Sequence, residues 1–203
     1  MKQRSEAWYQ ARLGCVGASS IVDVLATTKS GEAASRANLR ARLVAERLTG
    51  RPQESYVSAA MQHGIDTEDE ARAMYEVANG VMVDETGWHP HPRIAWSGAS
   101  PDGLVGDDGL LELKCPNTAT HIETLLSRKV PAKYLLQMQW QMAATGRAWV
   151  DFGSYDPRMP PELQLWVSRV LRDDARIKEL ERAVSTFLAD VEAVVARLSE
   201  AAA

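Results

Sequence analysis

Hydrophobic residues recur three and four positions apart over residues 5–79 and again near the end of the chain. This spacing places apolar side chains on one face of a helix. It predicts helices over residues 5–14, 17–26, 33–49, 57–79 and 173–199. Ser5 is suited to cap the first helix, and Gly14, Gly50 and Gly80 stand at the ends of predicted helices, where glycine commonly terminates the helical conformation.

The middle of the chain changes to short runs with strand-like composition, separated by turn residues. These runs cover residues 81–83, 94–100, 103–105, 110–114 and 149–155. One further helix is predicted over residues 132–145, with Pro131 suited to its first turn. The order of helices, hairpin-rich sheet, helix, strand and helix predicts a mixed α/β fold, with residues 1–203 forming one domain.

The composition limits the classes of protein that the chain can belong to. It has 203 residues, of which 45% are apolar, and a formal net charge of −4, so it lacks the positive field of a protein that coats nucleic acid by charge alone. Two distant cysteines are too few for a disulfide scaffold, a four-cysteine zinc site or an iron–sulfur cluster. No apolar run reaches transmembrane length and no signal-peptide core is present, so we expect a cytoplasmic protein.

The segment from Ser100 to Lys114 carries the most informative chemical pattern. It reads SPDGLVGDDGLLELK, an aspartate before one short strand, then an Asp-Asp-Gly turn and a returning strand. Because side chains alternate faces along a strand, Glu112 and Lys114 share a face and lie roughly 7 Å apart. The hairpin can carry Asp102 back beside them. Two carboxylates and an ammonium suit a Mg²⁺-dependent phosphodiesterase, although an ordinary turn with a solvated ion pair has the same pattern.

Further short motifs flank this segment. They are Trp8, residues 11–14 (ARLG), 18–19 (AS), 28–31 (TKSG), 63–72 (from HG to AR), 134–139 (from Tyr to Gln) and 155–159 (YDPRM). Together with residues 100–103 (SPDG) and 111–116 (LELKCP), they resemble the lambda exonuclease, or YqaJ-type viral recombinase, family of the PD-(D/E)XK nuclease superfamily. The segment after residue 159 carries no such motif.

This resemblance implies a restriction-endonuclease-like core, a mixed central β-sheet flanked by helices with a C-terminal helix. It also implies an alkaline exonuclease that depends on Mg²⁺, with Mn²⁺ as a substitute, and that degrades the 5′-ended strand of linear double-stranded DNA. Members of the family bind DNA ends, form homo-oligomers (a trimer in the best-known case) and work beside a single-strand annealing protein in phage-type recombination. The expected location is the cytoplasm of a bacterial host.

Asp102 and Glu112 are predicted metal ligands both from their spacing and from the resemblance. Mg²⁺ prefers oxygen ligands and keeps several waters, so two carboxylates and a backbone carbonyl suffice on the protein side. The resemblance points to the Leu113 carbonyl as this third oxygen. Lys114 is predicted to position the attacking water and to balance charge on the phosphate.

Two supporting residues stand on predicted helices. Glu68 lies in the acidic run 66–70, which by itself is typical of a solvated helix face, but the resemblance places Glu68 toward the metal site. Gln137 is compatible with a residue that simply satisfies backbone groups. The resemblance implies instead that Gln137 donates a hydrogen bond near the metal ligands or the scissile phosphate.

Arg12, Ser19 and Lys29 are the predicted phosphate contacts. Basic side chains and hydroxyls near helix starts suit a phosphate because the backbone N–H groups there favour anions. Their alternative roles are a charge at a helix C-terminus, an N-cap and a loop residue. The resemblance implies that the three grip the terminal 5′ phosphate and the nearby backbone, although Lys29 lacks the bidentate fork of an arginine.

Two other functions are compatible with these residues. One is a different PD-(D/E)XK endonuclease, which would also cut closed circular DNA. The other is a non-catalytic subunit of a recombination complex that binds DNA ends, which would bind duplex without metal-dependent cleavage.

Overall fold

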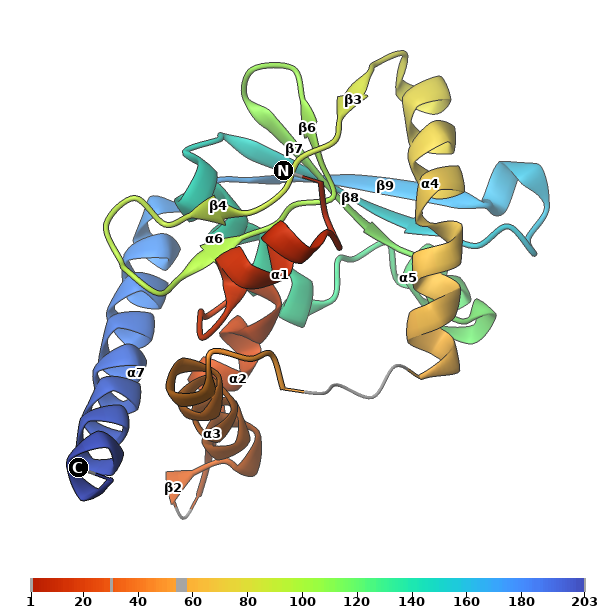
Figure 1. Cartoon of the computed structure of the whole chain (residues 1–203). Coiled ribbons are helices and arrows are strands. Elements are labelled where there is room, and N and C mark those ends of the chain that lie inside the picture. Colours follow the sequence, from red (N-terminus) through yellow and green to blue (C-terminus); the bar gives the residue numbers. More distant parts are fainter. Residues whose placement is uncertain (1, 30, 54–57, 203) are drawn as a thin grey trace.

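A five-stranded mixed sheet forms the centre of the computed structural model, which describes residues 2–29, 31–53 and 58–202 (Figure 1). In spatial order its strands are β3 (Val83–Asp84), β6 (Gly103–Val105), β7 (Gly109–Lys114), β8 (Trp149–Tyr155) and β9 (Leu165–Leu171). Strands β7 and β8 run parallel, whereas the other neighbouring pairs are antiparallel. Two short hairpins stand outside this sheet: β1 (Thr27–Thr28) with β2 (Gly31–Glu32), and β4 (His89–Pro90) with β5 (Gly98–Ala99).

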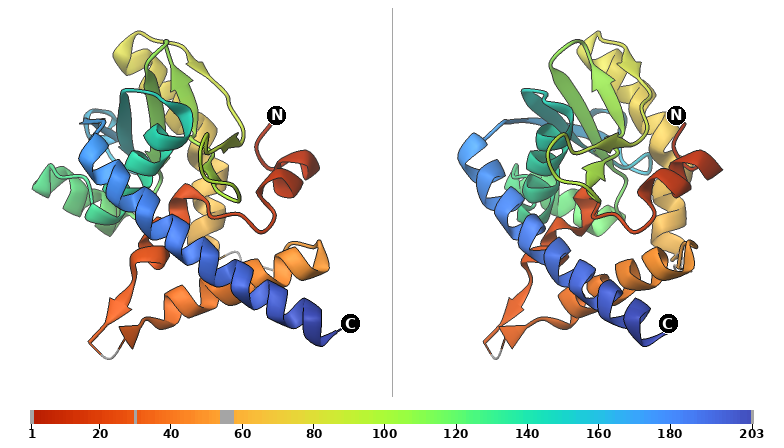
Figure 2. Two further views of the ribbon diagram at one scale, coloured as in Figure 1. Left: turned by 90° about the vertical axis from the view of Figure 1, so that its left-hand side faces the viewer. Right: turned by 60° about the vertical axis from the view of Figure 1, so that its left-hand side comes forward.

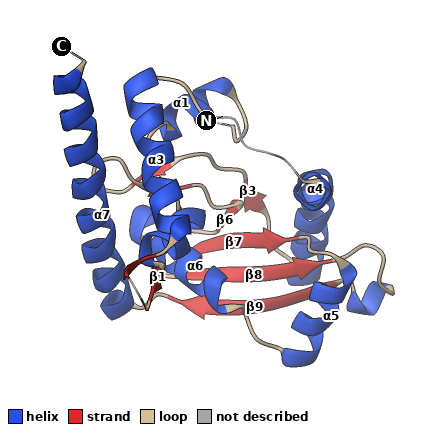
Figure 3. Ribbon diagram, turned by 90° about the horizontal axis from the view of Figure 1, so that it is seen from below, coloured by secondary structure: helices blue, strands red, loops and turns tan. Residues whose placement is uncertain are grey.

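Helices flank the sheet and continue beyond it. In chain order they are α1 (Glu6–Arg12), the 3₁₀ turn η1 (Ala18–Ser20), α2 (Ile21–Leu25), α3 (Ala34–Thr49), α4 (Ala59–Asn79), α5 (Thr118–Ser127), α6 (Ala132–Thr145), the 3₁₀ turn η2 (Pro161–Leu163) and α7 (Asp174–Ala201). Figure 3 shows β7, β8 and β9 side by side, with α7 toward one end of the strands and α4 and α5 toward the other. Figure 2 shows α7 crossing α3 below the sheet. None of the helices within the described ranges has both the length and the apolar character of a membrane span.

Alternation along β7 divides the apolar core into two clusters, one on each face of the sheet. Leu110 belongs to the larger cluster, which packs α2, α3, α6 and α7 together. Leu111 and Leu113 belong to the smaller cluster with Tyr75 of α4. Glu112 points to the same face as Leu110 and is buried. A carboxylate in an apolar layer is costly unless it is paired, so Glu112 requires hydrogen-bond donors from neighbouring elements.

The mixed α/β class predicted from the sequence is confirmed, and the predicted helices are present with shifted ends. Helix α1 begins after Ser5, whose Oγ accepts the Trp8 N–H at 3.3 Å. Helix α3 ends at Gly50, which has the left-handed φ of 64° that favours glycine. The predicted helix over 17–26 is divided into η1 and α2. The predicted start of α4 at residue 57 lies outside the described residues.

The prediction of a strand over residues 94–100 was wrong for residues 94–96, which form a bend and a turn. His91 Nδ1 accepts the N–H groups of both Arg93 and Ile94, which curls the chain away from an extended conformation. Helix α5 and strand β9 were not predicted. Asn117 caps α5 by accepting the Thr120 N–H, and β9 depends on seven residues of pairing with β8, a long-range contact.

Candidate active site

The β6–β7 hairpin brings Asp102, Glu112 and Lys114 together at one end of the sheet. The N–H of Asp102 donates to the Leu111 carbonyl at 3.1 Å, and Asp102 Oδ2 accepts the N–H of Leu113 at 2.7 Å. Lys114 Nζ donates to Glu112 Oε1. Glu112 and Lys114 therefore share a strand face, and the turn has returned Asp102 to the side of that strand, as the sequence predicted.

Glu112 is a buried carboxylate surrounded by three donors. Its side chain is 1% exposed, and it accepts hydrogen bonds from Lys114, from Gln137 Nε2 at 2.5 Å and from Gln141 Nε2 at 2.5 Å. Both glutamines come from α6, where positions four apart lie on one face. A carboxylate offers about four acceptor directions, so Glu112 keeps one for a further ligand. Gln141 was not predicted as a site residue, although its spacing from Gln137 is the signal that could have found it.

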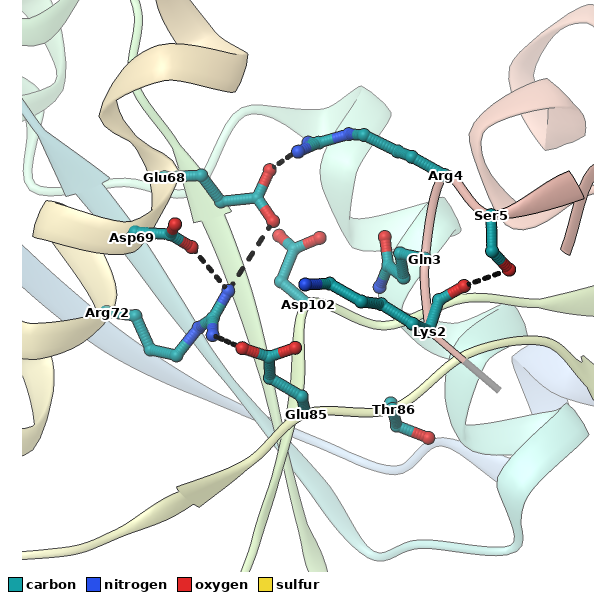
Figure 4. Close-up of a pocket in the computed structure, with 10 residues that line it drawn as sticks. All are labelled: Lys2, Gln3, Arg4, Ser5, Glu68, Asp69, Arg72, Glu85, Thr86 and Asp102. Carbon is teal, nitrogen blue, oxygen red and sulfur yellow. Dashed lines mark hydrogen bonds and ion pairs between the residues drawn. The ribbon is translucent and has the colours of Figure 1, made fainter.

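Glu68 reaches the same region from α4. It lines a cavity of about 570 Å³, here called the carboxylate cavity, together with Asp102, Leu113 and Lys114. Glu68 and Asp102 also line a neighbouring cavity of about 420 Å³, and Figure 4 shows their carboxylates next to each other. Of the other carboxylates in this acidic run, Asp66 accepts from Gln62 and Glu70 accepts from Tyr155. Asp69 accepts from Arg72, which also lies 3.9 Å from Glu68.

The surroundings raise the pKa values of both Asp102 and Lys114, with opposite consequences for their charges. Burial, and then the charge of Glu112, raise the pKa of Asp102 well above its ordinary 3.8. Burial alone would lower the pKa of Lys114, but the carboxylates of Glu112 and Asp102 outweigh it and raise that pKa above 10.5. Lys114 is therefore a cation at any physiological pH and can orient and neutralise, whereas Asp102 carries a charge that its surroundings disfavour.

This donor set fits a hard divalent cation. Burial, and then the charge of Glu112, disfavour the ionised form of Asp102, and a bound cation would offset both effects. The oxygens available are those two carboxylates and the Leu113 carbonyl, with Glu68 nearby, and such ligands suit Mg²⁺ or Mn²⁺. Within the described residues no three His, Cys, Asp or Glu side chains group as a metal site, so waters and substrate oxygens would complete the coordination.

We expect Asp102→Asn to stabilise the metal-free protein. The Asp102 pKa is higher in the folded chain than its ordinary 3.8, so the folded state loses stability as pH rises from that value through the raised pKa. Asparagine carries no charge and can still accept the Leu113 N–H. Thermal unfolding in EDTA should give the variant a higher midpoint, by an amount that grows from acid to neutral pH.

A divalent cation should raise the midpoint of the unsubstituted chain and leave that of Asp102→Asn almost unchanged, because ligand binding stabilises only a state that binds it. If Asp102→Asn melts at a lower temperature than the unsubstituted chain at neutral pH in EDTA, the charge of Asp102 does not destabilise the metal-free fold.

Arg12 and Ser19 line a third cavity of about 410 Å³, here called the arginine cavity, which lies between α1, η1 and α3. The Arg12 guanidinium lies 3.8 Å from the centre of the Trp8 ring and 5.7 Å from that of Trp88. Burial and the charge of Arg42 lower the pKa of Arg12 to about 10. Among the described residues no carboxylate forms an ion pair with Arg12, so its charge is available to an anion.

Arg42 is a residue of this cavity that the sequence did not reveal. It comes from α3, lies 3.9 Å from Glu46 and donates to Ser20 Oγ at 3.5 Å. Nothing in the α3 sequence distinguishes it from the other arginines of that helix. Its proximity to Arg12 places two guanidinium groups at one cavity, an arrangement that suits a phosphate.

Lys29 lies apart from this pair. It is exposed in the turn between β1 and β2, and it is not among the residues that line the arginine cavity. In Figure 1 strand β2 lies next to α3, on the side away from the central sheet. The structure thus brings Arg12 and Ser19 to one cavity and does not bring Lys29 there; a DNA contact by Lys29 stays a prediction.

Trp8 connects the arginine cavity to the hairpin that carries Asp102. Its ring stacks against Arg12, while its Nε1 donates to Ser100 Oγ at 2.8 Å, two residues before Asp102. Ile65 of α4 lines both the arginine cavity and the carboxylate cavity. The arginine cavity and the carboxylate cavity therefore adjoin each other at Ile65.

The chain is similar to known nucleases along almost its whole length. Residues 7–148 match the model of the YqaJ-like viral recombinase domain. The crystal structure of an alkaline exonuclease (LHK-Exo) from Laribacter hongkongensis matches this chain with a TM-score of 0.91 and 52% sequence identity, covering 98% of each chain. The structure of LHK-Exo in complex with dAMP gives the same values. No curated protein matches the chain.

A phage-related exonuclease from Haemophilus somnus 129PT has a TM-score of 0.74 at 14% identity, covering 91% of this chain and 96% of its own. This more distant likeness shows the fold alone. The match in architecture across both neighbours confirms the predicted restriction-endonuclease-like fold.

Proposed function

The chain belongs to the family of YqaJ-like viral recombinases, and from that premise we propose that it is a Mg²⁺-dependent exonuclease that degrades the 5′-ended strand of linear duplex DNA. The observation that carries the proposal is the grouping of Asp102, Glu112 and Lys114 at the β6–β7 hairpin, together with a cavity lined by Arg12, which has no carboxylate partner among the described residues. The relative from Laribacter hongkongensis is an alkaline exonuclease, and its complex holds dAMP, a 5′-mononucleotide of the kind that this reaction releases.

The residues that line the carboxylate cavity and the side chains that contact Glu112 have different roles in the chemistry. Asp102, Glu112 and the Leu113 carbonyl would hold the Mg²⁺, or Mn²⁺ in its place, which when bound supplies charge to polarise the phosphate and to acidify a water. Lys114, kept protonated by its two acidic neighbours, orients the attacking water and balances charge on the scissile phosphate. Gln137 and Gln141 hold the Glu112 carboxylate in one orientation.

The arginine cavity accounts for the choice of DNA end. A terminal phosphate carries more negative charge than a phosphodiester, and the guanidinium groups of Arg12 and Arg42 with the Ser19 hydroxyl match it. Trp8 holds Arg12 at a constant place relative to the Asp102 hairpin. A strand anchored by its 5′ phosphate in this cavity would present its first phosphodiester to the carboxylates, which gives 5′→3′ polarity.

Family membership supports two further parts of the proposal. The enzyme would act at double-stranded DNA ends as a homo-oligomer, a trimer by family resemblance. It would produce the 3′-ended single strand that a single-strand annealing protein pairs in phage-type recombination, in the cytoplasm of the bacterial host.

We expect linear duplex to be digested from its 5′ ends only when Mg²⁺ is present. EDTA should stop the reaction because, without the cation, the carboxylates of Asp102 and Glu112 would repel the phosphate. A 5′-phosphorylated end should be used roughly tenfold or more faster than a 5′-hydroxyl end, the effect of losing a charge-assisted hydrogen bond. Arg12→Gln should remove most of this preference. End-labelled duplexes, with timed analysis of the released nucleotides, measure all three effects.

Closed circular DNA is the control substrate, since an exonuclease has no end to bind there. Cleavage of the circle would favour an endonuclease of the same fold, and duplex binding without Mg²⁺-dependent digestion would favour a non-catalytic subunit. Release of label from the 3′ ends first would refute the polarity.

A further inference from the structure

Residues 2–5 form one wall of the 420 Å³ cavity that Glu68 and Asp102 line (Figure 4). Gln3 Nε2 donates to the Pro101 carbonyl at 2.7 Å, which attaches this segment to the residue before Asp102. Arg4 has φ 63°, a left-handed conformation that is uncommon for residues other than glycine. The segment is therefore held in a specific shape against the catalytic hairpin.

Arg4 points from this segment toward the carboxylates. Its Nη2 lies 2.5 Å from Glu68 Oε2, and Figure 4 shows Asp102 beside this pair. The Arg4 side chain is 41% exposed, so an ion pair there adds little to stability. The guanidinium has five N–H donors, and its described bond to Glu68 uses one of them. Most of its donor capacity is left for another acceptor.

Arg4 also lines the arginine cavity with Arg12 and Ser19. It thus stands where the acidic cavity beside Asp102 meets the cavity that would hold the terminal phosphate. In the proposed reaction the 5′ phosphate binds in the arginine cavity and the scissile phosphodiester lies beside Asp102. Only one nucleotide separates these two phosphates. The nearest DNA acceptor for Arg4 on the acidic side is therefore a non-bridging oxygen of the scissile phosphate.

We propose that Arg4 is a substrate-binding residue that contacts the scissile phosphate, and that Glu68 is a positioning residue that acts through Arg4. This inference rests on the proposed exonuclease function. The planar guanidinium can bond Glu68 on one edge and a phosphate oxygen on another, which a lysine ammonium does less well. Negative charge that grows on the phosphate strengthens the contact as the reaction proceeds.

Arg4→Ala should lower kcat by about 10- to 100-fold, with Arg4→Lys recovering part of the loss, because the charge returns without the fork. The preference for a 5′-phosphorylated end should stay unchanged, since Arg12 and Ser19 supply it. Arg176→Ala is the matched control: Arg176 is also 41% exposed and also pairs with a glutamate, Glu179, at 2.5 Å, but on α7. The control should digest DNA at the rate of the unsubstituted chain, and all variants should melt at similar temperatures.

A double-mutant cycle tests the role of Glu68. If Glu68 acts through Arg4, Glu68→Gln alone should lower the rate of digestion. The same substitution made in Arg4→Ala should lower the rate almost no further. Independent, multiplying losses would overturn this role, as would a rate in Arg4→Ala that equals or exceeds that of the unsubstituted chain. Loss of the 5′-phosphate preference in Arg4→Ala would overturn the contact with the scissile phosphate.

The same assays separate this inference from the proposed function. If the unsubstituted chain does not digest linear duplex in Mg²⁺, the exonuclease function itself fails. If the unsubstituted chain digests DNA, Glu112→Gln does not, and Arg4→Ala is unaffected, the function stands and only the role of Arg4 is lost.

Discussion

Glu112→Gln is expected to lower the rate of Mg²⁺-dependent digestion by about a thousandfold, the order of effect seen when one preorganised polar group is removed from a catalytic site. Glutamine has nearly the same shape but carries no charge, and it offers one acceptor oxygen where the carboxylate offers two. In the structure both carboxylate oxygens are used, Oε1 by Lys114 and Gln137 and Oε2 by Gln141. The substitution therefore removes one of the two carboxylates proposed to hold the metal, and it places an amide N–H₂ group opposite a side chain that also donates.

Single-turnover digestion of a 5′-phosphorylated duplex, with the variant in excess over DNA ends, measures this loss without the contribution of product release. End binding measured in Ca²⁺ or EDTA should be largely retained, because the arginine cavity is unchanged. Glu179→Gln on α7 is a suitable control, since Glu179 is 60% exposed and far from the hairpin in sequence and fold. A Glu112→Gln rate within a few-fold of the control would remove Glu112 from the mechanism.

Lys114→Met is expected to lower the same rate by about 10²- to 10⁴-fold, the usual contribution of a group that manages a proton or a charge in the transition state. Methionine keeps the length of the side chain but removes the ammonium that would orient the water. The substitution also leaves the buried Glu112 carboxylate without its cation, so a lower melting temperature accompanies the loss. Digestion should be compared at a temperature where both proteins are folded.

The pH dependence distinguishes the role of Lys114 from that of a general base. Its pKa is raised above 10.5, so the stabilising pair with Glu112 is fully present below that value and is lost only as pH rises through the raised pKa. A rate that rises with an apparent pKa near neutrality and loses this limb in Lys114→Met would show instead that Lys114 acts as a base.

The sequence predicted the parts of the site that depend on neighbours along the chain. Glu112 and Lys114 share a face because side chains alternate on a strand, and Asp102 returns beside them because a short Asp-Asp-Gly turn joins two strands that pair. The long helices α3 and α7 were predicted for a similar reason, since their apolar residues repeat with the helical period. In each case the determining interactions span few residues.

Contacts between distant segments could not be predicted in this way. Gln141 donates to Glu112 across 29 positions, Trp8 to Ser100 across 92, and Arg4 to Glu68 across 64. The spacing of Gln141 from Gln137 was a local signal for its position on α6, but no local pattern shows which distant partner each of these side chains meets. Lys29 illustrates the converse: its motif stands close to Ser19 in sequence, but the β1–β2 hairpin carries it away from the arginine cavity.

The sequence by itself determined which chemical groups the protein has and, through strand alternation and helical period, which of them share a face. Only the tertiary structure decided which helix supplies the partners of Glu112, which arginines meet in one cavity and how that cavity is joined to the carboxylates. The physical reason is that secondary structure follows from short-range geometry, whereas the packing of α4, α6 and the N-terminal segment around β7 depends on burial summed over the whole chain.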